Sequence, residues 1–549
     1  MRPLDWVVLA GSLVFIVAYG LYKSRGANTV NRFLLAGKTM PWYAMALSIM
    51  ATQASAITFI STTGQAYVDG MRFVQFYFGL PIAMVILSAT AVPIFHRANV
   101  YTAYEYLEGR FDARTRALAS IIFLIQRGLA VGLALYAPAI VLAVIFGWPD
   151  NITTVIMGVI VVFYTVIGGV QAVTWTDVQQ MLIIFLGLFV SLFTIVWLLP
   201  ADVSLLNAVE LAGAAGRLNV VDFSFDWDNR YNMWSGLIGG AFLALAYFGA
   251  DQSQVQRYLT GRSIAQSKLS LLFNAVAKIP MQFFILFVGA LVFVFFTFVK
   301  PPMLFQPAAL AKVTDPEIHA QYDRAFETRR LAAREWLAAQ DNEQRLADLR
   351  GAERELNRAR QTAIQASGDP NLNDTNYIFL SFVTRYLPTG VVGLIIAAIF
   401  AAAMSTISAE INSLATVTMI DIYRRHLRRD ESDRHYLFVS RAATAFWGAY
   451  AVFFAGFGKN LGSLIEAVNM LGSLFYGSLL GVFVLAFFFP RVSGRGAFHG
   501  MLAGEAAIFA AFFFTEISFL WYNVIGSLVV LAVGLALQGP KKHSRMAGR

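Results

Sequence analysis

Small polar side chains interrupt three otherwise apolar stretches of the sequence, and they are the residues best suited to bind an ion. The first stretch is Ser48–Ser61, SIMATQASAITFIS, and the second is Ala401–Asn412, AAAMSTISAEIN. In the third, Gly168-Gly169 precede the segment WTDVQ, which contains Asp177. Hydroxyl, carbonyl and carboxylate oxygens are hard ligands that suit Na⁺ better than a softer ion. The three stretches therefore predict a sodium site.

Each stretch also has a purely structural interpretation. Hydroxyl groups in an apolar helix can bond back to the preceding turn, and small polar residues help helices to pack together. Asp177 could begin a helix as a cap or first-turn acid. Alternatively, the helix containing Ser48–Ser61 is locally broken, and its freed backbone carbonyls coordinate a cation. The residues alone leave both interpretations open.

Motifs for enzymatic chemistry are missing from the sequence. Gly37-Lys38-Thr39 resembles the end of a phosphate-binding loop, but Arg32 stands where that loop needs its first glycine. The chain has no cysteine, its six histidines are never at zinc-ligand spacing, and no nucleophile elbow is present. We therefore expect no enzymatic activity, no cofactor and no ATP-driven transport by this chain alone.

The elements that must position these residues are membrane helices. The chain is 58% hydrophobic and only 14% charged. Apolar runs of roughly 18 residues or more, each long enough to cross a bilayer, recur from Leu4 to Leu537. Runs such as Met181–Leu199 are uniformly apolar, which excludes the alternating pattern of a β-barrel. The sequence predicts an all-α polytopic membrane protein with about thirteen transmembrane helices.

The distribution of basic residues predicts the orientation in the plasma (inner) membrane. Lysine and arginine concentrate in alternate loops, and this bias marks the cytoplasmic side. With an odd number of spans, the N-terminus is expected outside and the C-terminus in the cytoplasm. The net charge of +9 is attributed to these loops, so the expected environment is a lipid bilayer and nucleic acid is not an expected partner.

One segment, Lys300–Thr375, departs from the apolar pattern because it is rich in charges of both signs. It predicts an extramembrane helical insert. Glu317–Ala366 is either one long helix or, as we favour, a hairpin of two, since Asp341-Asn342 and Gly351 interrupt the helical pattern. Such an insert could be a solvated appendage, a lid or a docking site for a partner.

Several motifs occur in a fixed order along the chain. They are SIMATQASAITF from Ser48, AYEYLEGRF at Ala103–Phe111, LYAPA at Leu135–Ala139, YTVIGGVQAVTWTDVQ at Tyr164–Gln179, DQSQVQRYL at Asp251–Leu259, and Asn412–Tyr423. Together they resemble the motifs of the sodium/solute symporter family, which includes the sodium/glucose cotransporters. The resemblance leans toward the branch that transports monocarboxylates, multivitamins and iodide, and it covers nearly everything outside the insert.

The resemblance implies the inverted-repeat (5+5) core of the amino-acid/sodium transporters. The implied segments are 1–41, a first transmembrane helix and cytoplasmic loop outside the core; 42–199, the first repeat; 200–232, an extracytoplasmic loop; 233–299, the start of the second repeat; 300–375, the charged helical extracytoplasmic insert; 376–489, the rest of the second repeat; and 490–549, two C-terminal transmembrane helices and a cytoplasmic tail.

The resemblance also implies the site residues. The shared sodium site would be formed by Ala51, Ala54, Ala402, Ser405 and Thr406. A possible second sodium site would use Asp177, Ser405 and Ser408. Ala409 stands where two-sodium relatives can have another serine, so the number of sodium ions stays open. Substrate contacts would come from Thr58, Gln75, Tyr77, Asp251, Gln252 and Asn469, with Glu466 nearby.

The expected function is sodium-coupled secondary active symport, which imports a small solute by alternating access. Thr58 and Tyr77 replace residues typical of sugar carriers, so a glucose-type sugar is disfavoured, and the candidates are a monocarboxylate, another sugar, sialic acid, a vitamin or an anion. An anionic solute would need a cation in the cavity, for which Lys278 and Arg127 are candidates unless they are structural. Alternatives are a transport-inactive nutrient sensor, a channel or a proton-coupled carrier.

Overall fold

The computed structural model describes residues 1–23, 29–146, 150–340, 342–456 and 463–538. Within these residues the elements are helices, and strand-like pairing is limited to an isolated bridge between Met40 and Gly261. The described part contains 9 helical stretches that are long and apolar enough to cross a membrane, together with shorter apolar helices. The all-α membrane fold is therefore confirmed, whereas the count of about thirteen spans stays a prediction.

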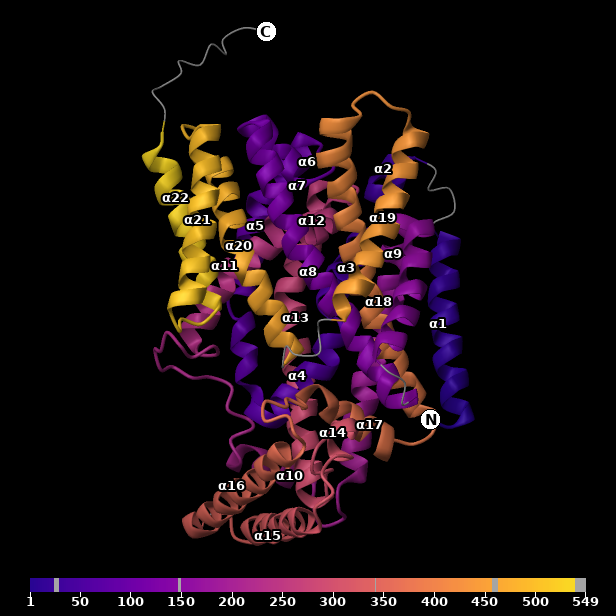
Figure 1. Ribbon diagram of the computed structural model, residues 1–549, viewed down its shortest axis with the longest axis vertical. Helices are drawn as coiled ribbons and strands as arrows, with labels where there is room; N and C mark the ends of the chain where they lie inside the picture. The colour runs from indigo at the N-terminus through magenta and orange to yellow at the C-terminus, as the bar shows by residue number, and fades with distance from the viewer. Residues whose placement is uncertain (24–28, 147–149, 341, 457–462, 539–549) are drawn as a thin grey trace.

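The first half of the chain supplies one peripheral helix and a series of packed helices (Figure 1). In order they are α1 (Pro3–Lys23), α2 (Val30–Leu35), η1 (Ala36–Lys38), α3 (Trp42–Gln53), α4 (Ala56–Asp69), η2 (Gly70–Tyr77), α5 (Leu80–Ala89), α6 (Ala91–Ala98), α7 (Ala103–Arg110), α8 (Ala113–Phe146) and α9 (Asp150–Leu198).

The second half contains the insert and the remaining long helices. In order they are α10 (Leu205–Ala214), η3 (Ser235–Gly239), α11 (Gly240–Gly249), α12 (Gln252–Leu259), α13 (Ile264–Phe298), α14 (Pro307–Leu310), α15 (Pro316–Ala338), α16 (Glu343–Ala366), η4 (Thr375–Tyr377), α17 (Ile378–Tyr386), α18 (Val391–Val417), η5 (Thr418–Leu427), α19 (Asp433–Ala455), α20 (Leu464–Phe488), α21 (Gly494–Phe514) and α22 (Leu520–Ala536).

A glycine divides α9 into two helical segments. Gly169 has φ 57° and ψ −161°, a conformation that a residue with a side chain rarely adopts. A Cβ at this position would also lie 2.6 Å from the Phe33 carbonyl oxygen. The apolar sequence predicts one span near 151–169 and another near 176–199, and Gly169 lies at the boundary between them.

Two membrane helices are broken near their middles, one in each half of the chain. Between α3 and α4, Ala54 takes φ −86° and ψ 61°, so the helix expected to break within Ser48–Ser61 does so. Between α11 and α12, Asp251 is extended and its side chain caps α12 by accepting from the Ser253 N–H. A break in the first span of each repeat agrees with an inverted-repeat core.

Helix α18 lies at the centre of the molecule, where nearly all of its residues are buried. It packs against α9, α8, α1 and α3. Exposed apolar side chains belong instead to outer helices, for example Val7 on α1 and Phe193 on α9, and their exposure is expected where a helix faces lipid. The span predicted near 377–419 is divided, because Gly390, with φ 89°, separates α17 from α18.

The charged insert contains helices α15 and α16, which pack against each other as an antiparallel pair. This pair lies at one end of the bundle, and α6 and α7 lie at the opposite end (Figure 1). Asn342 caps α16, so this part of the insert is a pair of helices and Gly351 lies within the second of them. Apolar residues such as Phe326 and Leu356 form a small core that is separate from the membrane core.

Candidate functional site

The break after α3 frees backbone carbonyls in the middle of the bundle. Because α3 ends at Gln53, the carbonyls of its last turn lose the amide partners that a continuous helix would supply. Two of them accept from hydroxyls: Thr52 O from Thr406 at 3.1 Å and Gln53 O from Thr58 at 3.1 Å. Ala51 and Ala54, which flank these positions, are fully buried.

Helix α18 brings its hydroxyls to this break. Thr406 contacts α3, whereas its neighbour Ser405 donates to Asp177 on α9 at 2.6 Å. Ser48 on α3 donates to the other carboxylate oxygen of Asp177 at 2.5 Å. Ser408 bonds back to the Ser405 carbonyl at 3.0 Å. Three helices therefore direct a carboxylate, hydroxyls and carbonyls at one another in the protein interior.

The residues of both predicted sodium sites are therefore neighbours. Ser405 and Thr406 join α3, α9 and α18, and Ala402 is buried one turn earlier on α18. Asp177 lies inside α9 and does not begin a helix, so the capping interpretation is wrong. Ser48, which the sequence analysis did not assign to a sodium site, shares the Asp177 carboxylate. Whether these oxygens bind sodium stays a prediction.

A central cavity of about 110 Å³ lies beside this cluster. Residues from both halves of the chain line it, and they belong to α3, α4, η2, α5, α8, α11, α18 and α20. Polar and aromatic lining residues include Gln53, Thr58, Tyr77, Gln126, Arg127, Tyr247, Thr406, Glu410, Asn469 and Tyr476.

Three of the six predicted substrate residues line the cavity: Thr58, Tyr77 and Asn469. Gln75 lies elsewhere, donating to the Tyr231 carbonyl at 2.9 Å and accepting from the Asp222 N–H at 2.9 Å.

The other two predicted substrate residues hold structural contacts. Gln252 bonds to the backbone of Tyr101 and Ala103, away from the cavity. Asp251 lies behind the cavity wall, where it accepts from Tyr476 at 2.8 Å and pairs with Arg127. Arg127 and Tyr476 themselves line the cavity.

Arg127 is held between two acidic residues. It pairs with Asp251 and, at 2.7 Å, with Glu410, and it also donates to the Tyr476 hydroxyl at 2.6 Å. All of these groups are buried, and a buried ion pair is stable only when its geometry and hydrogen bonding are good. The sequence contained a clue to this cluster, since an ionisable residue in an apolar span needs a partner.

Lys278 on α13 contrasts with Arg127. Its side chain is fully buried, and its Nζ lies 5.3 Å from the centre of the Tyr77 ring, which lines the cavity. Among the described residues its Nζ has no hydrogen-bond partner. Gln282, one turn further along α13, is also buried and likewise lacks partners in the described part of the chain. Neither residue lines the cavity, and Tyr77 is the lining residue that Lys278 contacts.

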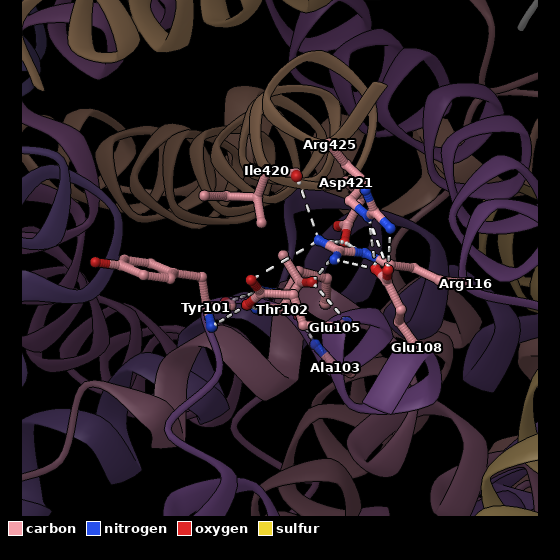
Figure 2. Close-up of polar contacts among 10 residues, drawn as sticks. Tyr101, Thr102, Ala103, Glu105, Glu108, Arg116, Ile420, Asp421 and Arg425 are labelled. Carbon is pink, nitrogen blue, oxygen red and sulfur yellow. Dashed lines mark hydrogen bonds and ion pairs between the residues drawn. The ribbon is translucent and has the colours of Figure 1, made fainter. Parts of the chain in front are cut away.

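A second ionic cluster (Figure 2) involves α7, which lies at the end of the bundle opposite the insert (Figure 1). Glu108 on α7 accepts from Arg116 on α8 at 2.8 Å and from Arg425 on η5 at 2.7 Å. Arg116 also pairs with Asp421 on η5 at 2.6 Å. The hydrogen bond from Arg425, with a further one from Arg116, outweighs burial and lowers the pKa of Glu108 to about 2. The cluster therefore joins three elements by charge.

Comparison with known proteins agrees with this geometry. The model of the Sodium:solute symporter family matches residues 33–318 and 361–504. The chain is 29% identical to the human Sodium-coupled monocarboxylate transporter 1, over 91% of this chain and 72% of that protein. It is 28% identical to the Sodium-dependent multivitamin transporter of Oryctolagus cuniculus, over 98% of this chain and 73% of that protein.

A bacterial relative and a solved structure are also sodium-coupled symporters. The chain is 28% identical to the Sodium/sialic acid symporter NanT of Aliivibrio fischeri, over 97% of this chain and 92% of that protein. A substrate-bound, outward-open structure of a Na⁺-coupled sialic acid symporter superimposes with a TM-score of 0.77, at 25% identity and over 97% of each chain. The chain belongs to the Sodium:solute symporter family and is a sodium-coupled symporter.

Proposed function

We propose that this protein imports a small monocarboxylate together with sodium by alternating access, without an enzymatic step or cofactor. Sodium coupling is supported by the position of two hydroxyls on α18. Thr406 donates to the Thr52 carbonyl at the helix break, at 3.1 Å, and Ser405 donates to the Asp177 carboxylate, at 2.6 Å. Freed carbonyls and hydroxyls at a helix break are the ligands that transporters offer to Na⁺.

The sodium ion would bind between α3 and α18. Its ligands would be the carbonyls of Ala51, Ala54 and Ala402 and the hydroxyls of Ser405 and Thr406. A second ion would bind beside Asp177, Ser405 and Ser408. Sodium in these positions would replace hydrogen bonds between α3, α9 and α18, so its binding would favour one arrangement of these helices.

Size and charge support a small anionic solute. The central cavity, at about 110 Å³, is well below the volume of a typical drug-sized ligand pocket. Thr58, Tyr77 and Asn469 would contact the solute. Lys278 would provide the cation, because Arg127 already has two acidic partners whereas Lys278 has none among the described residues.

The orientation that we propose places the insert and the N-terminus outside the cell and α7 in the cytoplasm. The N-terminal helix lies at the insert end, because Asp5 accepts from the Gly390 N–H at 2.5 Å, just before α18. The basic residues Arg97, Arg110 and Arg114 lie on or beside α6 and α7 at the other end, as expected for the cytoplasmic side.

The test is uptake of radiolabelled solutes into proteoliposomes that contain the purified protein. We expect an inward sodium gradient, but not a potassium gradient, to drive uptake of lactate or pyruvate over sialic acid, biotin and glucose. Lys278→Met should reduce monocarboxylate uptake at least about tenfold, since a charge-assisted hydrogen bond is worth 1.5–3 kcal/mol. Lys268→Met is the matched control, because Lys268 is on the same helix but is only partly buried, whereas Lys278 is fully buried beside Tyr77.

Two outcomes would contradict the proposal in different ways. Sodium-driven uptake of sialic acid, biotin or glucose in place of monocarboxylates would contradict the substrate class and leave sodium coupling intact. Uptake driven equally by a proton gradient without sodium would contradict the sodium site.

A further inference from the structure

A second cavity, of about 230 Å³, lies at the seam between the insert and the membrane core. Its wall combines Tyr67 and Val68 at the end of α4, Arg217 after α10, Pro301 and Phe305 after α13, and residues of the α15–α16 pair. It shares no lining residue with the central cavity. Tyr67 lies nine residues beyond Thr58 on α4, which places the two cavities about 13 Å apart along that helix.

Three arginines line this seam cavity: Arg217, Arg329 and Arg360. Glu353, which also lines it, is shared between Arg217 at 3.5 Å and Arg329 at 3.2 Å. Asp374 pairs with Arg360. Three guanidinium groups against two carboxylates leave one positive charge unbalanced in this group of residues.

Burial makes that positive charge significant. The Arg329 side chain is only 1% exposed, and those of Arg217 and Arg360 are 17% and 21% exposed. Among the described residues, the buried Nε–H groups of Arg217 and Arg329 have no acceptor. A buried donor without an acceptor raises the free energy of the folded protein. An oxygen atom that enters the site and accepts from these N–H groups would therefore be stabilising.

The remaining polar lining is also rich in donors. Asn357 and Gln361, one turn apart on α16, present amide groups to the cavity wall. Burial raises the pKa of Tyr322, so its hydroxyl stays protonated and adds no negative charge. Donors and positive charge around a small hollow are the features that bind carboxylate or phosphate groups, which arginine recognises through paired N–H donors.

Part of this site lies outside the residues that match the family model. The family model leaves residues 319–360 unmatched, and Arg329, Glu353 and Arg360 all lie in that interval. Arg217, Tyr67 and Phe305 belong to the matched part. The cavity therefore exists because the insert packs on the core.

We propose that the seam cavity binds a small oxyanion, such as a carboxylate or phosphate, which links the α15–α16 pair to the core. The anion would balance the excess charge of Arg217, Arg329 and Arg360 and would accept from the free Nε–H groups of Arg217 and Arg329. It would be a ligand additional to the transported solute, bound beside the mouth of the transporter on the insert side.

The test measures the melting temperature of the purified full-length protein at constant sodium concentration and ionic strength. Sodium phosphate and sodium acetate are compared with sodium chloride. We expect phosphate or acetate to raise the melting temperature saturably, as a ligand specific for the folded state does. The anion that binds more tightly shows whether the natural ligand is an inorganic or an organic oxyanion.

Variants assign the effect to this cavity. Arg217→Gln/Arg360→Gln should weaken anion binding at least about tenfold, because charge-assisted hydrogen bonds are lost. Arg324→Gln is the control, since Arg324 is exposed on α15, pairs with Glu317 and does not line the cavity. Lys278→Met should leave the seam site unchanged, which separates it from the central cavity.

A variant with the opposite effect keeps the proposal testable even if the double variant does not fold. Glu353→Gln removes a carboxylate from the wall and should tighten anion binding by about tenfold. The proposal is wrong if neither anion stabilises the wild type more than chloride. It is equally wrong if Arg217→Gln/Arg360→Gln binds like the wild type, or if Glu353→Gln binds the anion more weakly.

Discussion

Ser405 and Thr406 are adjacent on α18 but bond to different helices, Ser405 to Asp177 on α9 and Thr406 to the Thr52 carbonyl on α3. Consecutive residues on a helix point about 100° apart, so together they reach two neighbours. Both hydroxyls could be singled out from the sequence because they lie in an apolar span. Their partners are far apart in the chain, so the residues alone could not identify them: the family resemblance grouped Asp177 with Ser405, whereas Thr52 was not predicted as a partner of Thr406.

The first prediction concerns these two hydroxyls. Sodium at a hundred times its dissociation constant should stabilise the wild type by about 2.7 kcal/mol relative to potassium. Ser405→Ala/Thr406→Ala should abolish that difference, because two sodium ligands are lost. The measurement is thermal unfolding of the purified protein in sodium and in potassium chloride.

Ser413→Ala provides the control for this experiment. Ser413 is on the same helix, but within the part of the chain that the structure describes its hydroxyl bonds to α18 itself, donating to the Glu410 carbonyl at 2.7 Å. It should keep the full sodium effect. If the double variant also keeps it, the ion binds elsewhere.

At the level of elements, several helices approach so closely that only glycine fits between them. A Cβ on Gly64 of α4 would lie 2.1 Å from the carbonyl oxygen of Thr375, which begins η4. By contrast, a Cβ on Gly351 of α16 would meet nothing within 4 Å. Both glycines look alike in the sequence, and only the packing distinguishes them.

The second prediction follows from this contrast. Gly64→Ala should lower the free energy of unfolding by about 1–3 kcal/mol, because the backbone of η4 must move away from α4. Gly351→Ala should instead stabilise α16 by about 0.5–1 kcal/mol, since alanine is the better helix former. Denaturation of both variants beside the wild type measures the difference. Equal effects of the two substitutions would show that α4 and η4 are not in close contact.

The breaks in the membrane helices were predictable to different degrees. Polar crowding in Ser48–Ser61 indicated the first break, where α3 ends and α4 begins. The break before α12 was not predicted, because a motif that begins with Asp251 also fits an ordinary helix start. Gly390, which separates α17 from α18, lies in an apolar run that predicts a single span.

At the scale of the whole molecule, charged residues far apart in the chain hold the end opposite the insert together. Glu108 joins Arg116 and Arg425, so that α7 is tied to both α8 and η5 (Figure 2). The backbone of α7 also bonds to Gln252 of the broken helix pair. Helix α7 therefore contacts α12, α8 and η5 at the same end of the bundle.

The third prediction is a pH dependence that originates from this cluster. Glu108 has a pKa lowered from 4.5 to about 2, so its ionised form stabilises the folded state fully above pH 4.5. That contribution should be lost progressively as pH falls from 4.5 toward 2. Glu108→Gln should be less stable than the wild type at pH 7, and the difference between the two should shrink on acidification.

Melting temperatures of both proteins across this pH range provide the measurement. Glu431→Gln is a suitable control, because Glu431 pairs only loosely with Arg428, at 3.5 Å, in an exposed loop. A constant difference between wild type and Glu108→Gln at all pH values would contradict the role of the ionised carboxylate.

The sequence by itself determined the membrane class, the helical fold, the family motifs and the polar stretches that could bind an ion. These properties depend on composition and local pattern, which the chain carries residue by residue. It also indicated that the insert is a helical pair, from the interruption near Asn342.

Only the tertiary structure decided which polar residues share a site. Tyr476 completes the Arg127 cluster, Lys278 lies against Tyr77, and Gln75 turns away from the cavity to hold a loop. The seam cavity likewise needs Arg217 and Arg360, which are 143 positions apart in the chain, to line the same hollow. Such contacts depend on how separate helices pack, because the free energy of burying a charge is set by the neighbours that folding brings to it.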